Sequence, residues 1–398
     1  MIVKGDPSAL RTMNRTSILR ILRRVGPISR TQLAELTGLS PASVSGVTAE
    51  LIAEKLLVEQ SIGEAGSSGG RRPIFINIDY SAHFAIGLKL SEHRLEGVLT
   101  DLSLKVLTHI TEDLTEHEPT RVAAQIAALC KKLYKRAKVS PDDLIGVGIG
   151  LSGVIDAVNG IAVHAPLLGW KQIKIAEMVS QKTNLPSWID NDVNSFAAAE
   201  RLFGHAKHAN SFIAIAIGRG LGAAIICNGE IHRGRDGGAG EFGHNKILLN
   251  GRTCSCGRQG CLEAYTTQPA LLGLFLEQFP EHQGISIPDL VQLANAQHQG
   301  AISVLETAGA LLGQHISYLV NAFNPELIVF GGEGAELGDA FFEPMRQSLR
   351  GLAFDGLATE LPLIVVPWAN DDFTPWAQGA ASLAVQHAFD TGVLLKNA

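Results

Sequence analysis

The chain has 398 residues, of which 46% are hydrophobic and 18% charged, and its net charge at pH 7 is −6. This is the composition of a globular protein; it excludes wholesale disorder, and the length favours two or three domains. The charge is uneven: residues 1–76 carry ten basic and six acidic residues, a net charge of +4, whereas residues 77–398 carry 23 basic and 33 acidic ones, a net charge of −10. A weakly basic segment on an acidic body indicates a nucleic-acid-binding module joined to another kind of domain.

Three helices are predicted within residues 1–76. An apolar stripe at helical spacing covers residues 14–25, and a Gly-Pro pair ends it. Ser29 begins a capping-box pattern, and Gly38 then breaks the second helix. Ser40 and the proline after it are suited to the N-cap and first position of a third helix. A short helix, a turn with glycine and another helix form the pattern of a helix-turn-helix.

The third helix is predicted to present small and polar residues away from its apolar stripe, and small side chains let a helix enter the DNA major groove. The candidate DNA contacts on it are Ser40, Ala42, Ser43, Ser45, Gly46 and Thr48. A Gly-rich tip at 63–73 between two strand-like runs is typical of a wing, and Arg71 and Arg72 within it are suited to a minor groove. The alternative interpretation is a three-helix protein-interaction domain followed by a flexible linker.

Residues 77–398 are predicted to alternate strands and helices in an α/β architecture. Strands are expected at 84–90, 95–99, 144–153, 186–189, 212–217, 222–227 and 326–330, and helices at 120–135, 195–203 and 375–389. Several strands run into glycine turns, where α/β proteins bind ligands, and hairpins near the start of each half predict two related lobes around a cleft. The expected domains are 1–76, 77–193 and 194–374.

Three of the five cysteines lie within eight positions, close after a histidine. His244, Cys254, Cys256 and Cys261 make a Cys₃His set, which matches a closed tetrahedral structural zinc site. The alternative is a redox loop or a chance cluster. Clustering in a chain without an export signal favours metal or redox chemistry over disulfides, and three of only five cysteines in eight positions argue against chance. Because all four positions would be filled by protein, the ion is expected to organise structure and not to activate water.

Polar residues suited to a polyhydroxylated ligand flank this loop in the sequence. Asn191 and Asp192 follow a predicted strand, Glu241 lies three residues before His244, and Glu263 lies two residues after the last cysteine of the cluster. Carboxylates accept hydrogen bonds from hydroxyls, and an amide both donates and accepts. No stretch is long and apolar enough to span a bilayer, and the first 24 residues lack the apolar core of a secretion signal, so a cytoplasmic protein is expected.

The segment from Glu241 to His244, followed by CxCGxxGCLE ending at Glu263, resembles the signature of the ROK family of repressors, open reading frames and sugar kinases. With the helix-turn-helix, the chain is similar to the family's transcriptional regulators of the NagC/Mlc/XylR type. The resemblance implies an actin-like, ribonuclease-H-like body with two lobes and a sugar in the cleft, and a C-terminal segment, 375–398, that returns to the first lobe. It implies sugar contacts from Gly153, Asn191, Asp192, Glu241, His244 and Glu263.

In the kinases of this family the aspartate matching Asp192 is the general base, and phosphate-binding loops hold the nucleotide. Here the first loop is altered at Ala85, Leu88 and Lys89, and Arg219 stands in the second, whereas Gly331 and Gly332 are retained. Positioning of phosphates carries most of phosphoryl transfer, so no useful kinase activity is expected. Leu167 replaces an asparagine that reaches the sugar in kinases, which leaves the identity of the sugar open.

Three functions are therefore compared. The first is a sugar-responsive repressor that binds double-stranded operator DNA as a homodimer or homotetramer, with the sign of the sugar effect left open. The second is an active sugar kinase with an accessory DNA-binding head, and the third is a scaffold whose head binds protein. The resemblance also leaves open a protein of the phosphotransferase system as a partner.

Overall fold

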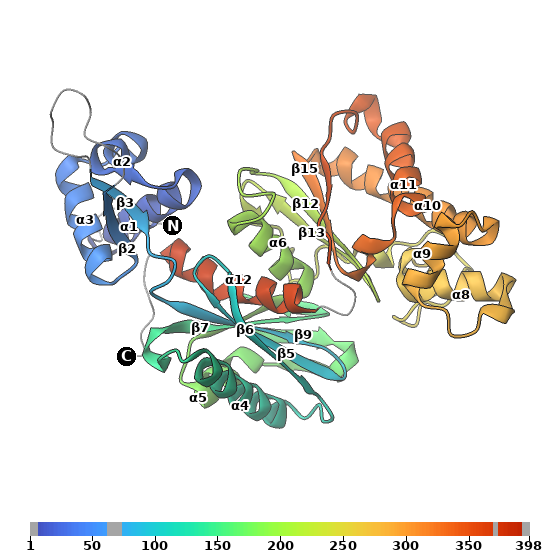
Figure 1. The fold of residues 1–398 in the computed structure, drawn as a ribbon, viewed down its shortest axis with the longest axis horizontal. Coiled ribbons are helices and arrows are strands. Elements are labelled where there is room, and N and C mark those ends of the chain that lie inside the picture. Colours follow the sequence, from blue (N-terminus) through green and yellow to red (C-terminus); the bar gives the residue numbers. More distant parts are fainter. Residues whose placement is uncertain (1–6, 62–73, 369–372, 392–398) are drawn as a thin grey trace. The chain divides into compact units, whose positions relative to one another are not determined.

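The computed structural model describes residues 7–61, 74–368 and 373–391 (Figure 1). The chain forms two compact units, one made of Met1–Phe203 with Trp376–Ala398 and the other of Gly204–Pro375. The first lobe was expected to end at 193, but a boundary there would cut an uninterrupted helix that runs from Asp192 to Leu202. No helix in the described part of the chain is long and apolar enough to cross a membrane.

The first unit begins with a winged-helix domain. Its elements are α1 (Pro7–Val25), β1 (Ile28–Ser29), α2 (Arg30–Thr37), α3 (Pro41–Ala53), β2 (Leu57–Ser61) and β3 (Ile74–Ile78). The Ser29 hydroxyl and the Gln32 side chain form the capping box of α2, which ends at Gly38 in the left-handed conformation. Ser40 caps α3 by accepting a hydrogen bond from the backbone of Ser43. The three predicted helices are confirmed, and the tip between β2 and β3, with Arg71 and Arg72, lies outside the described residues.

The rest of this unit is an α/β lobe. Its elements are β4 (Phe84–Leu90), β5 (Arg94–Asp101), β6 (Val106–Asp113), α4 (Pro119–Ala137), η1 (Pro141–Asp143), β7 (Leu144–Leu151), β8 (Val154–Asp156), β9 (Ile161–Ala165), η2 (Pro166–Leu168), β10 (Trp170–Ile173), α5 (Ile175–Thr183), β11 (Ser187–Asn191), α6 (Asp192–Leu202) and α12 (Thr374–Thr391). The main sheet has the order β11-β7-β4-β5-β6, and β10-β9-β8 form a small sheet beside it. Residues of α12 from Trp376 onward belong to this unit.

Helices cover both faces of the main sheet (Figure 1). On one face α12 packs directly on glycines of the strands: a Cβ atom added at Gly87 would lie 1.9 Å from the carbonyl oxygen of Ala377. A Cβ atom at Gly148 would likewise lie 1.8 Å from that of Ala380. On the other face, Gly97 of β5 lies against leucine side chains of α4. Side chains larger than hydrogen at Gly87 and Gly148 would push α12 off the sheet.

The second unit repeats this plan. Its elements are β12 (Phe212–Ile217), β13 (Leu221–Cys227), β14 (Glu230–Ile231), η3 (Phe242–His244), α7 (Glu263–Thr266), α8 (Gln268–Gln278), η4 (Pro280–His282), α9 (Ile287–Asn295), α10 (Gln299–Phe323), β15 (Leu327–Gly331), η5 (Glu333–Glu336), α11 (Asp339–Leu352), η6 (Phe354–Gly356) and β16 (Leu363–Val365). The sheet order is β14-β13-β12-β15-β16. Gly309 on α10 lets that helix approach the backbone of Phe341 on α11.

The two sheets share one topology. Each begins with three consecutive antiparallel strands. A fourth strand then pairs in parallel with the first of these, and a fifth pairs in parallel with the fourth. The predicted α/β class and the two related lobes are therefore confirmed. The hairpins β4–β5 and β12–β13 begin the two repeats, as the sequence predicted, and the β12–β13 turn contains Gly218 and Gly220.

Candidate functional site

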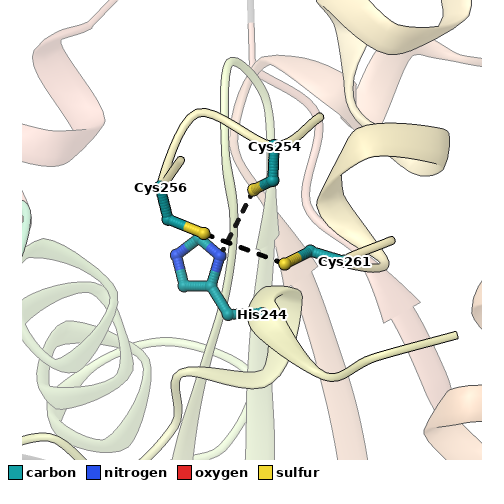
Figure 2. A group of neighbouring side chains, drawn as sticks. All are labelled: His244, Cys254, Cys256 and Cys261. Atoms are coloured by element: carbon teal, nitrogen blue, oxygen red, sulfur yellow. Dashed lines mark hydrogen bonds between the residues drawn. The ribbon is translucent and has the colours of Figure 1, made fainter. Parts of the chain in front are cut away.

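The four predicted metal ligands lie together in the second unit (Figure 2). His244 ends the short helix η3, and the cysteines lie on the loop that follows it. One ligand atom from each residue lies within 4.8 Å of the others. The loop needs glycine at Gly260, where φ is +74° and a Cβ atom would lie 1.5 Å from the carbonyl oxygen of Leu248.

The spacing of these atoms fits a tetrahedral ion. Zinc–sulfur bonds of about 2.3 Å at tetrahedral angles would separate two sulfurs by roughly 3.8 Å. The Sγ atoms of Cys256 and Cys261 are 3.8 Å apart, and Cys254 Sγ lies 3.5 Å from His244 Nδ1. All cysteines of the cluster are free thiols. Burial raises the pKa of Cys254 to about 12, so an ion bound there would displace a thiol proton.

Two predicted sugar-binding carboxylates adjoin this cluster. Glu263 is buried; its Oε2 accepts a hydrogen bond from the backbone of Leu221 at 3.2 Å, and its Oε1 accepts one from the Ser255 hydroxyl at 2.5 Å. The Oε2 atom of Glu241, which is exposed, lies 3.7 Å from His244 Nε2. The histidine therefore presents one ring nitrogen to Cys254 and the other to Glu241. Ser255 was not identified from the sequence, because only its contact with Glu263 distinguishes it.

The remaining predicted sugar-binding residues lie together in the first unit. Asn191 caps α6 by accepting a hydrogen bond from Val193 N, and its Nδ2 donates to the carbonyl oxygen of Gly153 at 3.1 Å. Gly153 has φ +125°, and a Cβ atom there would lie 2.3 Å from the carbonyl oxygen of His164. Asp192 is the first residue of α6 and is buried. One set of predicted sugar-binding residues thus belongs to each unit.

Asp192 has partners that the sequence did not reveal. The Lys89 ammonium donates a hydrogen bond to its carboxylate, forming a buried ion pair, and the Ser152 hydroxyl donates to it at 2.7 Å. Burial alone would raise the pKa of Asp192, but the charge of Lys89 and the hydrogen bonds from Lys89, Ser152 and Val193 N hold it below its ordinary value. The Asp192 carboxylate is therefore fixed in place as a hydrogen-bond acceptor, and its lowered pKa makes it a weaker base.

The positions that match kinase phosphate loops are occupied by other chemistry. Ala85 and Leu88 are buried apolar residues of β4. Arg219 is exposed in the turn between β12 and β13. Glu333, which no sequence motif indicates as part of the site, directs its carboxylate at that turn: a Cβ atom on Gly218 would lie 2.0 Å from Glu333 Oε2. A carboxylate beside this turn opposes a phosphate by like charge.

The helix-turn-helix exposes most of the residues expected to face DNA. Ser40, Ala42, Ser45 and Gly46 are exposed, and nothing lies within 4 Å of a Cβ atom built on Gly46. The Ser43 hydroxyl, which is partly exposed, lies 2.9 Å from that of Ser40.

The expectation that Thr48 faces outward is wrong. Its side chain is fully buried, with its hydroxyl donating to Val44 O at 2.8 Å and accepting from Arg30 Nε at 3.1 Å. The buried face of α3 also contains Val44, Val47 and Leu51, and it is wide enough to include Thr48. Thr48 therefore positions the side chain of Arg30, the first residue of α2.

These features define a class of protein: a winged-helix domain attached to a duplicated, actin-like α/β body with a Cys₃His cluster in its second repeat. A model of the ROK family matches residues 85–387, and the chain belongs to that family. The xylose repressor of Bacillus spizizenii is 31% identical over 386 residues, which cover 97% of this chain and 98% of that protein. NagC of Escherichia coli, a DNA-binding transcriptional dual regulator, is 29% identical over 400 residues, covering 99% and 97%.

Solved structures of this family cover different shares of the chain. A crystal structure of a ROK family transcriptional regulator, a homologue of the Escherichia coli Mlc protein, superposes with a TM-score of 0.85 at 27% identity and covers 97% of this chain and 98% of its own. A ROK glucokinase from Streptomyces griseus, solved with glucose and AMPPNP, gives a TM-score of 0.65 at 25% identity. That superposition covers 99% of the glucokinase chain but only 76% of this chain.

Proposed function

We propose that this chain is a sugar-responsive, DNA-binding transcriptional regulator that represses genes of carbohydrate uptake or catabolism. The observation that carries the proposal is the buried Lys89–Asp192 pair in a body joined to a winged helix. An aspartate tied to an ammonium group is a poor general base, yet it remains a hydrogen-bond acceptor for a ligand hydroxyl. Similarity over nearly the whole chain to proteins named as repressors supports the same function.

DNA binding is assigned to the winged helix, with Ser40, Ala42, Ser43, Ser45 and Gly46 as candidate contacts and Arg71 and Arg72 in the tip. Such a regulator acts on the chromosome, so we place it in the cytoplasm, and as a homodimer or homotetramer, since one small head supplies limited specificity. The test is selection of a duplex from a randomised pool by the full chain, followed by fluorescence anisotropy at increasing salt. Weakening with salt is expected, because phosphate contacts release counterions. Enrichment of no sequence, with retention of protein partners instead, would favour the scaffold interpretation.

The effector is a monosaccharide or a derivative, recognised by Gly153, Asn191 and Asp192 of the first unit and by Glu241, His244 and Glu263 of the second. A thermal-shift screen of sugars and sugar phosphates identifies it, because a ligand that prefers the native state raises the melting temperature. Asp192→Asn and Glu263→Gln should each reduce the shift. A coupled ATPase assay with the same panel addresses the kinase alternative: sugar-stimulated ATP turnover would overturn the proposal.

The Cys₃His cluster is proposed to bind one structural zinc ion. Zinc would orient the His244 ring, whose other nitrogen faces Glu241, so sugar affinity is expected to depend on the metal. The test is the zinc content of Cys256→Ser against Cys227→Ser, since Cys227 is a free cysteine outside the cluster. The first variant should lose the metal and the second should keep it. Equal zinc in both variants would contradict the site.

A further inference from the structure

Helix α6 carries two of the proposed effector residues at its beginning. Asn191 is its N-cap and Asp192 its first residue, and both are fixed by contacts to the β7–β8 region, through Gly153 and Ser152. The helix then runs without interruption to Leu202, a length of about 16 Å at 1.5 Å per residue. Its N-terminal end therefore belongs to the site and its C-terminal end lies elsewhere in the same unit.

The C-terminal end of α6 is held by a residue of the DNA-binding domain. Arg23, in the last turn of α1, donates from Nη1 to the carbonyl oxygens of Leu202 at 2.8 Å and Arg201 at 3.3 Å. The last carbonyls of a helix have no partners within it and carry the negative end of its dipole, so a guanidinium is well suited to them. Burial, followed by the charge of Arg201, lowers the pKa of Arg23. The contact is thus a largely desolvated, charge-assisted one.

Further contacts join α1 to the ends of α6 and α12. The Thr16 hydroxyl of α1 donates to the carbonyl oxygen of Asp390 at 2.9 Å. The ring of Phe203, which follows α6, packs edge-on against Phe389 of α12 with centroids 6.4 Å apart. Leu202 and Phe389 share one buried cluster with Ile18, Leu19 and Leu22 of α1. The winged helix therefore rests on the C-terminal ends of two helices.

Helix α12 also begins beside the Lys89–Asp192 pair. The Lys89 ammonium lies 5.1 Å from the ring centroid of Trp376, and that ring packs against Phe196 of α6. Farther along, Gly379 brings α12 against the backbone of Phe196, and the Ser382 hydroxyl donates to Ser195 O. The two helices are packed together between the Asp192–Lys89 pair and the surface that holds α1.

We infer that Arg23 is the positioning residue through which effector binding at the start of α6 alters the placement of the DNA-binding domain. The inference rests on the proposed function. A ligand hydroxyl that bonds to Asp192 or Asn191 competes with Lys89, Ser152 and Gly153 for the same atoms. Because a helix moves as a stiff body, a shift at its start displaces the carbonyls that Arg23 holds. Effector and DNA affinity are then linked by the difference in these contacts between the two states.

The test is the ratio of DNA affinities with and without saturating effector, measured by anisotropy on the full chain with the selected duplex. Arg23→Met keeps the apolar stem but removes the donors, Arg23→Lys keeps the charge, and Arg24→Met is the matched control, because Arg24 is exposed on the same turn. The wild type and Arg24→Met should give the same ratio. Arg23→Met should bring this ratio about tenfold closer to unity, and Arg23→Lys should restore part of the wild-type effect. Sugar affinity measured without DNA should change less than about twofold in all variants, since Arg23 lies outside the sugar site.

An unchanged ratio in Arg23→Met would overturn the inference and leave the proposed function standing. A wild-type protein whose DNA affinity no sugar changes would overturn both. Should Arg23→Met fail to fold, hydrogen exchange on the wild type and Arg23→Lys decides. Effector should alter the protection of α1 amides in the wild type and alter it less in Arg23→Lys. Equal changes in the two proteins would also overturn the inference.

Discussion

At the scale of single residues, the Lys89–Asp192 pair determines what the site can do. Two charged side chains, of which 8% and 10% are exposed, lie in contact, so each is stable there only because of the other. The pair also explains how a body built like that of the sugar kinases loses a general base while keeping a hydrogen-bond acceptor. Nothing local in the sequence pairs position 89 with position 192, because the contact depends on how β4 and α6 meet in the folded lobe.

Lys89→Met should destabilise the protein by about 3 kcal/mol, since it leaves the Asp192 carboxylate buried without its countercharge. Urea unfolding at pH 7 measures this free energy. The Lys89→Met/Asp192→Asn double variant is the control, and it should lose less than the sum of the two single variants. Additive losses would show that the two side chains do not stabilise each other.

The same pair predicts a pH dependence. The folded pKa of Asp192 is lowered, so its stabilising contribution is present above the unfolded value of about 3.9 and is lost as the pH falls through the folded pKa. The difference in unfolding free energy between the wild type and Asp192→Asn should therefore be largest, and constant, from about pH 5 to 7, because the carboxyl group is then ionised in both the folded and the unfolded state. The difference should shrink at lower pH. A difference that does not change below pH 4 would contradict this assignment.

At the scale of elements, sequence patterns predicted what local chemistry determines. Ser29, Gly38 and Ser40 marked the helix ends in the winged helix, and strand runs such as 84–90 and 212–217 matched the observed strands. Helix α6 begins at Asp192 and not at 195, because Asn191 serves as its N-cap and not only as a strand end. The burial of Thr48 was missed because a hydroxyl was taken as a sign of an outward-facing position, whereas this one is satisfied within the apolar face by Val44 O on the same helix and by Arg30 on α2.

The metal loop offers a matched pair of glycines for testing how backbone conformation supports the cluster. Gly260→Ala should lose zinc and destabilise the second unit by about 2 kcal/mol or more, since a Cβ atom would meet the carbonyl oxygen of Leu248. Gly257→Ala has a similar positive φ but open space around it, so it should keep zinc at a cost of about 1 kcal/mol. Metal analysis and thermal unfolding measure both effects. Equal behaviour of the two variants would mean that close approach at Gly260 is unimportant.

At the scale of the whole molecule, the sequence predicted a winged helix and two related α/β lobes, but not the contacts that join the winged helix to the first lobe. The Cys₃His set was foreseen because its ligands lie close along the chain, and the two-lobed body because its hairpins repeat. The link from α1 through Arg23 to the end of α6 joins residues 178 or 179 positions apart, which no short pattern encodes. Regulation of a winged helix by a sugar therefore depends on features that only the folded chain reveals.

The account depends most on the claim that a sugar changes DNA binding without being phosphorylated. The most direct measurement is the affinity of the zinc-loaded full chain for its selected duplex across a panel of monosaccharides and their phosphates, with ATP turnover followed in the same samples. We predict that at least one of these ligands changes the DNA affinity by about tenfold or more, with no ATP consumed. Sugar-dependent ATP turnover with unchanged DNA affinity would contradict the account.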